Sequence, residues 1–196
     1  FKSKFPKKKI QLNKFILIYA GNLGKAQKLL TLLKAAKKMK YNRKLFIKIF
    51  GFGSEYEILK NYIEKNNLKN VKLFGKISKT RLYKEYINAD ALFLSLSKSK
   101  YLNYTIPAKL QTYLSLGKPI LASADGEIKK IINESKSGLC SKPEKEKQLS
   151  INLDKMVNSK KNIMVKYSNN SKKYFDKNFR SKLINKKFNN IFTKMI

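Results

Sequence analysis

Glycine is scarce in this sequence, and most of its glycines occupy positions where they could help to bind a phosphate. The chain has eight glycines, and six of them follow short apolar runs that are typical of buried strands. Ligands bind at the carboxyl edge of an open parallel sheet, and glycine there lets backbone N–H groups approach a phosphate closely. This placement predicts a nucleotide-type ligand, whereas the simpler interpretation is that glycine is common in such turns. The six are Gly21, Gly24, Gly51, Gly53, Gly75 and Gly126.

The spacing of these glycines disfavours two widespread nucleotide-binding loops. The run Gly21-Asn22-Leu23-Gly24 is not a G-x-G-x-x-G dinucleotide loop, and no acidic residue ends the second apolar run to hold a ribose. The run Gly51-Phe52-Gly53 is too short for the same motif. The sequence also lacks the G-x-x-x-x-G-K-[ST] pattern of a P-loop. A nicotinamide cofactor and a P-loop nucleotide are therefore both disfavoured.

The segment from Tyr104 to Ile120 provides a second candidate anion site. Pro107 suits the first turn of a helix, where its missing N–H costs nothing. The free N–H groups near Ala108 and Lys109 would then point into the crevice after the fourth apolar run, with Gln111 one turn further along the same face. A sugar nucleotide would fit an anion site at the helix start beside an amide. Taken alone, the segment is explained equally well by an ordinary capped helix.

Short apolar runs alternate with amphipathic stretches through the first three quarters of the chain. Nearly continuous apolar strands alternating with helices predict a doubly wound α/β fold, in which helices cover both faces of a parallel sheet. After about Pro143 the strands stop, and only helices follow. The predicted strands are Phe15–Ala20, Leu45–Phe50, Val71–Phe74, Ala91–Leu96, Pro119–Ser123 and Gly138–Ser141. The predicted helices are Gln27–Lys40, Glu55–Asn66, Lys79–Asn88, Pro107–Leu116, Glu127–Glu134, Glu144–Val157, Lys161–Lys177 and Phe179–Phe192.

The composition excludes several kinds of chemistry. The sequence has no His, which removes His bases, His metal ligands and Ser-His or Cys-His nucleophile pairs. Its one cysteine, Cys140, cannot form an internal disulfide or a thiolate zinc site, so we expect a reducing compartment. No apolar run approaches the roughly 18 residues of a membrane span. The chain begins with Phe1 instead of Met and is interpreted as a fragment or excised domain.

The formal net charge of +33 comes almost entirely from lysine. Only Arg43, Arg81 and Arg180 break this pattern among the 45 basic residues. Bidentate recognition of bases and phosphates favours arginine, so we expect no specific nucleic-acid partner. So positive a surface still attracts phosphates and anionic lipid. We therefore expect peripheral contact with an anionic membrane through the basic start and tail.

In their order and spacing, these motifs resemble the C-terminal domain of a family 4 glycosyltransferase, whose GT-B architecture has two facing Rossmann-like domains. The resemblance runs from about Phe15 to the C-terminus. It looks closest to bacterial polysaccharide transferases of the N-acetyl-fucosamine type, which carry a similar Thr-Ile-Pro-x-Lys-Leu-Gln stretch. The matching segments are 19–24, 51–55, 71–77, 89–95 and 107–119.

This resemblance implies the donor-binding half of a retaining glycosyltransferase. Such an enzyme transfers a sugar from a nucleotide-sugar, commonly UDP-linked, to a polysaccharide or lipid-linked acceptor such as an O-antigen or capsule precursor. It needs no cofactor and no obligatory metal, and it works in the cytoplasm, in places at the inner face of the plasma membrane. An N-terminal domain outside this chain would bind the acceptor, so the fragment alone would bind donor weakly and turn over nothing.

The resemblance also assigns site residues. The family's paired acidic residues, which contact the sugar and the ribose, correspond to the amides of Asn103 and Gln111. The usual basic residues at the diphosphate correspond to Asn22 and Gln27, so Lys25, Lys28 or Lys109 must replace them. The diphosphate and sugar set is Gly21, Asn22, Leu23, Gly24, Lys25, Gln27, Asn103, Thr105, Ile106, Pro107, Ala108 and Lys109. The ribose and base set is Gly51, Gly53, Gly75, Lys76, Ile77 and Gln111.

The chain is accordingly divided into three parts, and its catalytic residues are left unassigned. Residues 1–14 are a linker from a missing domain, 15–158 the nucleotide-sugar-binding domain, and 159–196 basic and aromatic helices packing on that domain and toward the missing one. Asp125 and Glu127 are interpreted as surface capping residues, not as an acid/base pair. Two alternatives stay open, namely another GT-B enzyme such as a nucleotide-sugar 2-epimerase, and a non-catalytic module that binds nucleic acid or anionic membrane.

Overall fold

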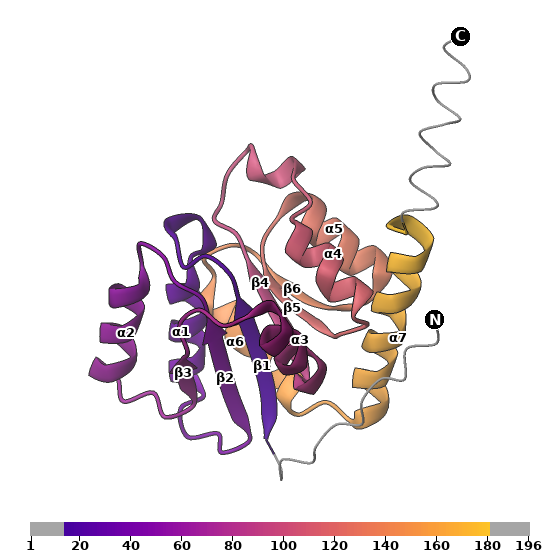
Figure 1. The fold of residues 1–196 in the computed structure, drawn as a ribbon. Coiled ribbons are helices and arrows are strands. Elements are labelled where there is room, and N and C mark those ends of the chain that lie inside the picture. The colour runs from indigo at the N-terminus through magenta and orange to yellow at the C-terminus, as the bar shows by residue number, and fades with distance from the viewer. Residues whose placement is uncertain (1–13, 181–196) are drawn as a thin grey trace.

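A parallel sheet of six strands organises residues 14–180, the part of the chain that the computed structural model describes (Figure 1). The strand order is β3-β2-β1-β4-β5-β6, and β1 pairs with β2 from Phe15 opposite Leu45 to Ala20 opposite Phe50. The doubly wound α/β fold is therefore confirmed, with each predicted strand placed to within one residue. The strands are β1 Phe15–Ala20, β2 Leu45–Phe50, β3 Val71–Leu73, β4 Ala91–Ser95, β5 Ile120–Ser123 and β6 Gly138–Ser141.

The sheet is buried on both faces because alternate residues of its strands enter two separate cores. In β1, Leu17 and Tyr19 join the core formed with α1, α2 and α6, whereas Ile16, Ile18 and Ala20 join the core formed with α3, α4 and α5. The last helix, α7, packs against α4 at the side of the molecule (Figure 1). The α-helices are α1 Leu29–Lys38, α2 Tyr56–Lys65, α3 Lys79–Asn88, α4 Ala108–Ser115, α5 Gly126–Ser135, α6 Glu146–Val157 and α7 Lys161–Asn178.

The predicted helix Gln27–Lys40 is interrupted at Lys28. A short 3-10 helix, η1 (Lys25–Gln27), precedes α1, and Lys28 between them has a left-handed backbone with φ of 45°. The Ser95 hydroxyl donates to the Gln27 carbonyl, and the Ser97 N–H donates to the Ala26 carbonyl at 2.7 Å. These carbonyls are the ones that a continuous helix would use, so contacts from the end of β4 stop the helix here.

Two further differences concern the loops and the C-terminus. A second 3-10 helix, η2 (Leu102–Tyr104), lies between β4 and α4, where the sequence predicts no element. The predicted helix Phe179–Phe192 does not begin at Phe179, because this residue is the C-cap of α7 and its backbone is not helical. The remainder of that prediction, from 181 onward, lies outside the described residues.

The loops after β1 and β2 are joined through their backbones. The Gly21 N–H donates to the Phe50 carbonyl at 2.9 Å, and the Leu23 N–H donates to the Phe52 carbonyl at 3.1 Å. Gly51 has φ of 136°, and a Cβ atom there would lie 1.8 Å from the carbonyl oxygen of Gly21. Glycine is thus required at 51 for the two loops to pack, a role separate from the phosphate contact that its position predicts.

Gly51→Ala should lower the free energy of unfolding by at least about 3 kcal/mol, because the added methyl group collides with backbone that cannot move aside. Gly75→Ala is the matched control. Gly75 has φ of 64°, but a Cβ atom added there would have no neighbour within 4 Å, so only the backbone cost of about 1–2 kcal/mol applies. Urea denaturation of both variants measures the difference, and equal losses would contradict the packing role of Gly51.

Candidate functional site

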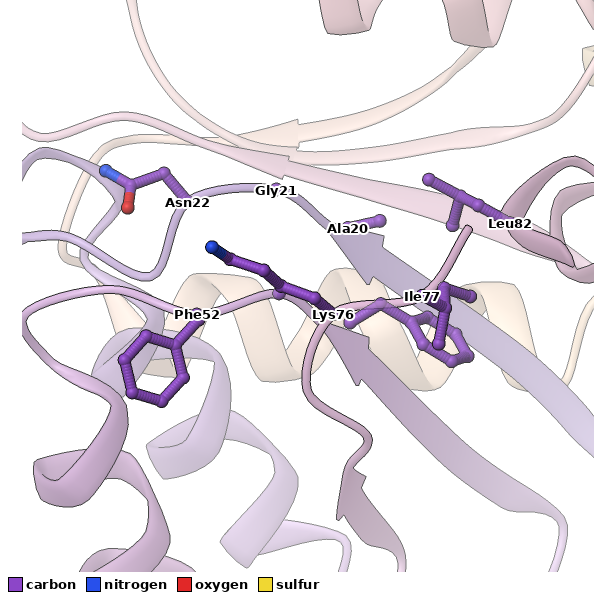
Figure 2. A pocket seen from close by; sticks show the side chains of 9 residues that line it. Ala20, Gly21, Asn22, Phe52, Lys76, Ile77 and Leu82 are labelled. Atoms are coloured by element: carbon purple, nitrogen blue, oxygen red, sulfur yellow. The ribbon is translucent and has the colours of Figure 1, made fainter. Parts of the chain in front are cut away.

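A cavity of about 450 Å³ opens at the carboxyl edge of the sheet (Figure 2). Its walls come from the loops after the first three strands and from the start of α3. Figure 2 shows the Lys76 side chain extended toward the loop that carries Gly21 and Asn22. The structure therefore brings together predicted residues from three separate loops. The lining residues are Ala20, Gly21, Asn22, Phe50, Gly51, Phe52, Lys76, Ile77 and Leu82.

The Lys109 ammonium lies beside the loop that carries Gly21 and Asn22. Its Nζ atom is 4.0 Å from the ring centroid of Tyr19, and a Cβ atom on Gly21 would come within 2.5 Å of it. Burial lowers the pKa of Lys109 to about 8, and no carboxylate of the described residues forms an ion pair with it. A partly desolvated cation without an acidic partner favours binding of an anion here.

The start of α4, the helix that carries Lys109, has free hydrogen-bond donors. Pro107 is the N-cap of α4, one position before the first helical turn in which the sequence places it. The Leu110 N–H donates to the Pro107 carbonyl at 2.9 Å, whereas the N–H groups of Ala108 and Lys109 precede this bond and keep the free donor positions of a helix N-terminus. With the Lys109 ammonium beside Gly21, these donors and the helix dipole favour negative charge at this position.

Two residues of the predicted diphosphate set have structural contacts of their own. The Leu23 side chain is fully buried in the core, and its backbone N–H donates to Phe52. The Gln27 side chain accepts a hydrogen bond from the Gly24 N–H at 3.2 Å. Leu23 and Gln27 therefore shape the loop from within.

The three candidate lysines differ in their surroundings. Lys25 is exposed on η1. Lys28 lies 3.8 Å from a carboxylate oxygen of Glu144. Only Lys109 contacts the loop at Gly21, so it is the best placed of the three to neutralise a diphosphate.

The segment between β4 and α4 lies apart from the lining of the cavity. The Thr105 hydroxyl donates to the Leu102 carbonyl at 2.8 Å, and the Ile106 side chain is exposed. The side-chain amides of Asn103 and Gln111 make no hydrogen bond within the described part of the chain, which leaves them free for ligand hydroxyls. Gly126 is needed for close approach, because a Cβ atom there would lie 2.1 Å from the Asn103 carbonyl oxygen.

Two of the remaining predicted glycines, Gly53 and Gly75, make backbone contacts between the loops. A Cβ atom on Gly53 would lie 2.6 Å from the carbonyl oxygen of Leu23, so Gly53 belongs to the packed backbone contact. The carbonyl of Gly75 accepts from the Gly51 N–H at 2.7 Å and joins the third loop to the second.

Sequence reasoning missed four cavity residues and Tyr19. Phe52 lies between two glycines predicted for the site, so its position in the sequence could have indicated that it lines the cavity. Leu82 comes from the apolar face of α3, where nothing in the sequence separates it from a core residue. Ala20, Phe50 and Tyr19 have the sequence pattern of ordinary strand residues.

Neither a metal cluster nor a membrane-spanning helix is found within residues 14–180. No group of three or more His, Cys, Asp or Glu side chains in this range could hold a metal ion. No helix in the same range is long and apolar enough to cross a bilayer.

The family of the chain follows from its sequence. Residues 1–174 match the family described as glycosyl transferases group 1, and the chain belongs to this family. No curated protein matches the sequence.

Solved structures share the fold. HepE from Anabaena in complex with UDP is 14% identical, with a TM-score of 0.80 over 93% of this chain and 49% of that one. A TarM variant from S. aureus, in complex with fondaparinux, alpha-GlcNAc-glycerol and UDP, is 15% identical. Its TM-score is 0.78 over 96% of this chain and 38% of that one. The catalytic domain of cholesterol-alpha-glucosyltransferase from Helicobacter pylori is 14% identical, with a TM-score of 0.68 over 83% of this chain and 98% of that one.

This likeness shows the fold, which is the Rossmann-like α/β fold of the C-terminal domains of GT-B glycosyltransferases. The chain spans less than half the length of the Anabaena and S. aureus chains.

Lys109→Met should raise the free energy of unfolding by roughly 1 kcal/mol near pH 7, because folding partly desolvates an ammonium that lacks an acidic partner. The folded-state pKa of about 8 lies below the ordinary 10.5, so the unfolded chain binds more protons between these values. Wild-type stability should therefore rise with pH across this window and approach that of the variant. Urea denaturation at several pH values measures this. Lys25→Met is the exposed control, and a pH-independent Lys109→Met effect would contradict the desolvation.

Proposed function

We propose that this chain binds the nucleotide-sugar donor of a glycosyltransferase, with UDP as the nucleotide. The observation that supports this most directly is the Lys109 ammonium, which has no acidic partner among the described residues and lies against Gly21, a residue that lines a cavity of nucleotide size. Family membership supports sugar transfer, and the similar Anabaena and S. aureus structures are complexes with UDP.

In this proposal the diphosphate lies between the loop after β1 and the start of α4. Lys109 and the N–H groups at the helix start stabilise the negative charge that grows on the leaving diphosphate. Lys76 approaches from the opposite wall of the cavity (Figure 2). Ile77 and Phe52 line the remainder, where the ribose and base would lie.

The amides of Asn103 and Gln111 contact the sugar and the ribose in this proposal. An amide can donate and accept hydrogen bonds but adds no negative charge beside a cationic sugar centre. Transfer with retention through an oxocarbenium-like transition state would then depend mainly on leaving-group stabilisation, without a metal.

The remaining features of the whole protein are also proposals. We assign it to the family 4 transferases, near the N-acetyl-fucosamine type, with a polysaccharide or lipid-linked acceptor. A second domain would bind that acceptor, so the 196-residue chain alone should bind donor without turnover. We place the enzyme in the cytoplasm, with peripheral contact to an anionic inner membrane through its lysines.

The first test is a titration of the chain with UDP, followed by calorimetry and by NMR of the backbone amides. We expect binding in the millimolar range or tighter, with shifts at Gly21, Gly24 and Lys109. Lys109→Met should weaken binding at least about tenfold, because a charge-assisted contact is lost, whereas Lys25→Met should have a smaller effect. Absence of these shifts at millimolar UDP would contradict the proposed function.

The same titration has a predicted pH dependence. UDP should bind most tightly below the Lys109 pKa of about 8 and more weakly as the pH rises through it, because the bound diphosphate favours the protonated amine. Lys109→Arg stays charged and should remove this fall. Steep salt dependence with no preference for UDP over RNA would instead favour a non-catalytic basic module.

Gln111→Leu should lower UDP affinity roughly three- to tenfold, because one hydrogen bond to a ribose hydroxyl is lost. It should lower the affinity for 2′,3′-dideoxy-UDP much less, and Gln111→Glu should retain the preference for the ribose hydroxyls. Calorimetry with both ligands measures this. Thr112→Val is the control on the same helix, since its hydroxyl donates to the Ala108 carbonyl. Equal losses for both nucleotides would place Gln111 away from the ribose.

A further inference from the structure

Tyr19 contacts both parts of the candidate diphosphate site with one buried side chain. Its hydroxyl donates to the Asn22 carbonyl at 2.6 Å, within the loop after β1. The centroid of its ring lies 4.0 Å from the Nζ atom of Lys109, on α4. The side chain is fully buried, so it is enclosed by the protein and does not contact a ligand directly.

The two contacts use different properties of the tyrosine. A neutral hydroxyl donates to a carbonyl, and burial raises the pKa of Tyr19 far above its ordinary value, so the proton stays in place. The π-face attracts an ammonium, most strongly where water is displaced. Phenylalanine would preserve only the second contact, and leucine would preserve neither.

We propose that Tyr19 is a positioning residue for the donor, which fixes the Gly21–Gly24 loop and the Lys109 ammonium relative to each other. This rests on the proposed function for its consequence in donor binding, but its geometry is independent of any ligand. The loop and Lys109 are separated by more than eighty residues in sequence, and Tyr19 contacts both.

The groups around Lys109 make its titration a readout of this contact. Tyr19 faces the ammonium from β1, and Tyr19 in turn interacts electrostatically with Tyr86 of α3 and Tyr113 of α4. Burial raises the pKa of both of these tyrosines, so they remain neutral where Lys109 titrates. No carboxylate of the described residues forms an ion pair with Lys109. A change in the Lys109 midpoint therefore reports on Tyr19.

The first arm of the test uses the ligand-free chain. The pH titration of the Lys109 13Cε resonance gives the midpoint of Lys109 deprotonation. Hydrogen exchange of the backbone amides in the Gly21–Gly24 loop reports how well that loop is ordered. Tyr19→Phe should leave the midpoint near the wild-type value and speed exchange at Asn22–Gly24. Tyr19→Leu should speed exchange and also shift the midpoint, because the ring is gone. Tyr86→Phe, which removes another buried hydroxyl, should change neither.

The second arm measures UDP affinity of the same variants by calorimetry. We expect a loss of about three- to tenfold for Tyr19→Phe and a larger loss for Tyr19→Leu, with Tyr86→Phe unchanged. Circular dichroism shows which variants fold. If Tyr19→Leu does not fold, Tyr19→Phe alone decides the loop contact.

The two arms separate this inference from the proposed function. Unchanged exchange, midpoint and UDP affinity in a folded Tyr19→Phe and Tyr19→Leu would overturn the positioning role. Failure of the wild-type chain to bind UDP would overturn the proposed function, while the ligand-free arm would still decide whether Tyr19 links the loop to Lys109.

Discussion

The close packing around Gly21 is the constraint on which the site depends. On one side its carbonyl oxygen leaves no space for a Cβ atom at Gly51, and on the other its own hydrogen faces the Lys109 ammonium. Three segments distant in sequence, the loops after β1 and β2 and the start of α4, therefore meet at one residue without a side chain. A side chain at position 21 would displace the Lys109 ammonium from the loop, because a Cβ atom there would lie 2.5 Å from its Nζ atom.

The charge of the site differs in kind from the charge of the surface. Most of the lysines are solvated, and their fields are screened by salt over a short distance. Lys109 is partly desolvated and has no acidic partner among the described residues, which strengthens its attraction for an anion. In the proposed site, this one half-buried ammonium contributes more to the recognition of a diphosphate than many exposed lysines do, although the exposed lysines dominate the net charge of +33.

The sequence predicts the strands and the sheet edge because both depend on local patterns. Apolar runs mark strands buried on both faces, and glycines mark the turns that follow them. It does not predict the break at Lys28, which depends on Ser95 and Ser97 from a distant strand end. Nor does it distinguish Tyr19 from the other apolar residues of β1, because its two contacts are made with segments that only the fold brings close.

Asn22 and Gln27 stand where the resemblance to the family predicts basic residues, and Gln27 has a structural contact instead. Its amide oxygen accepts from the Gly24 N–H, so this side chain supports the loop from inside. In the proposed site, the positive charge comes from Lys109 of α4, whose ammonium contacts the ring of Tyr19 in β1. A site of this kind is sensitive to how α4 packs on the sheet. Truncation of Leu110 or Tyr113, the side chains that anchor α4 in the second core, should therefore act on donor binding without contacting the donor.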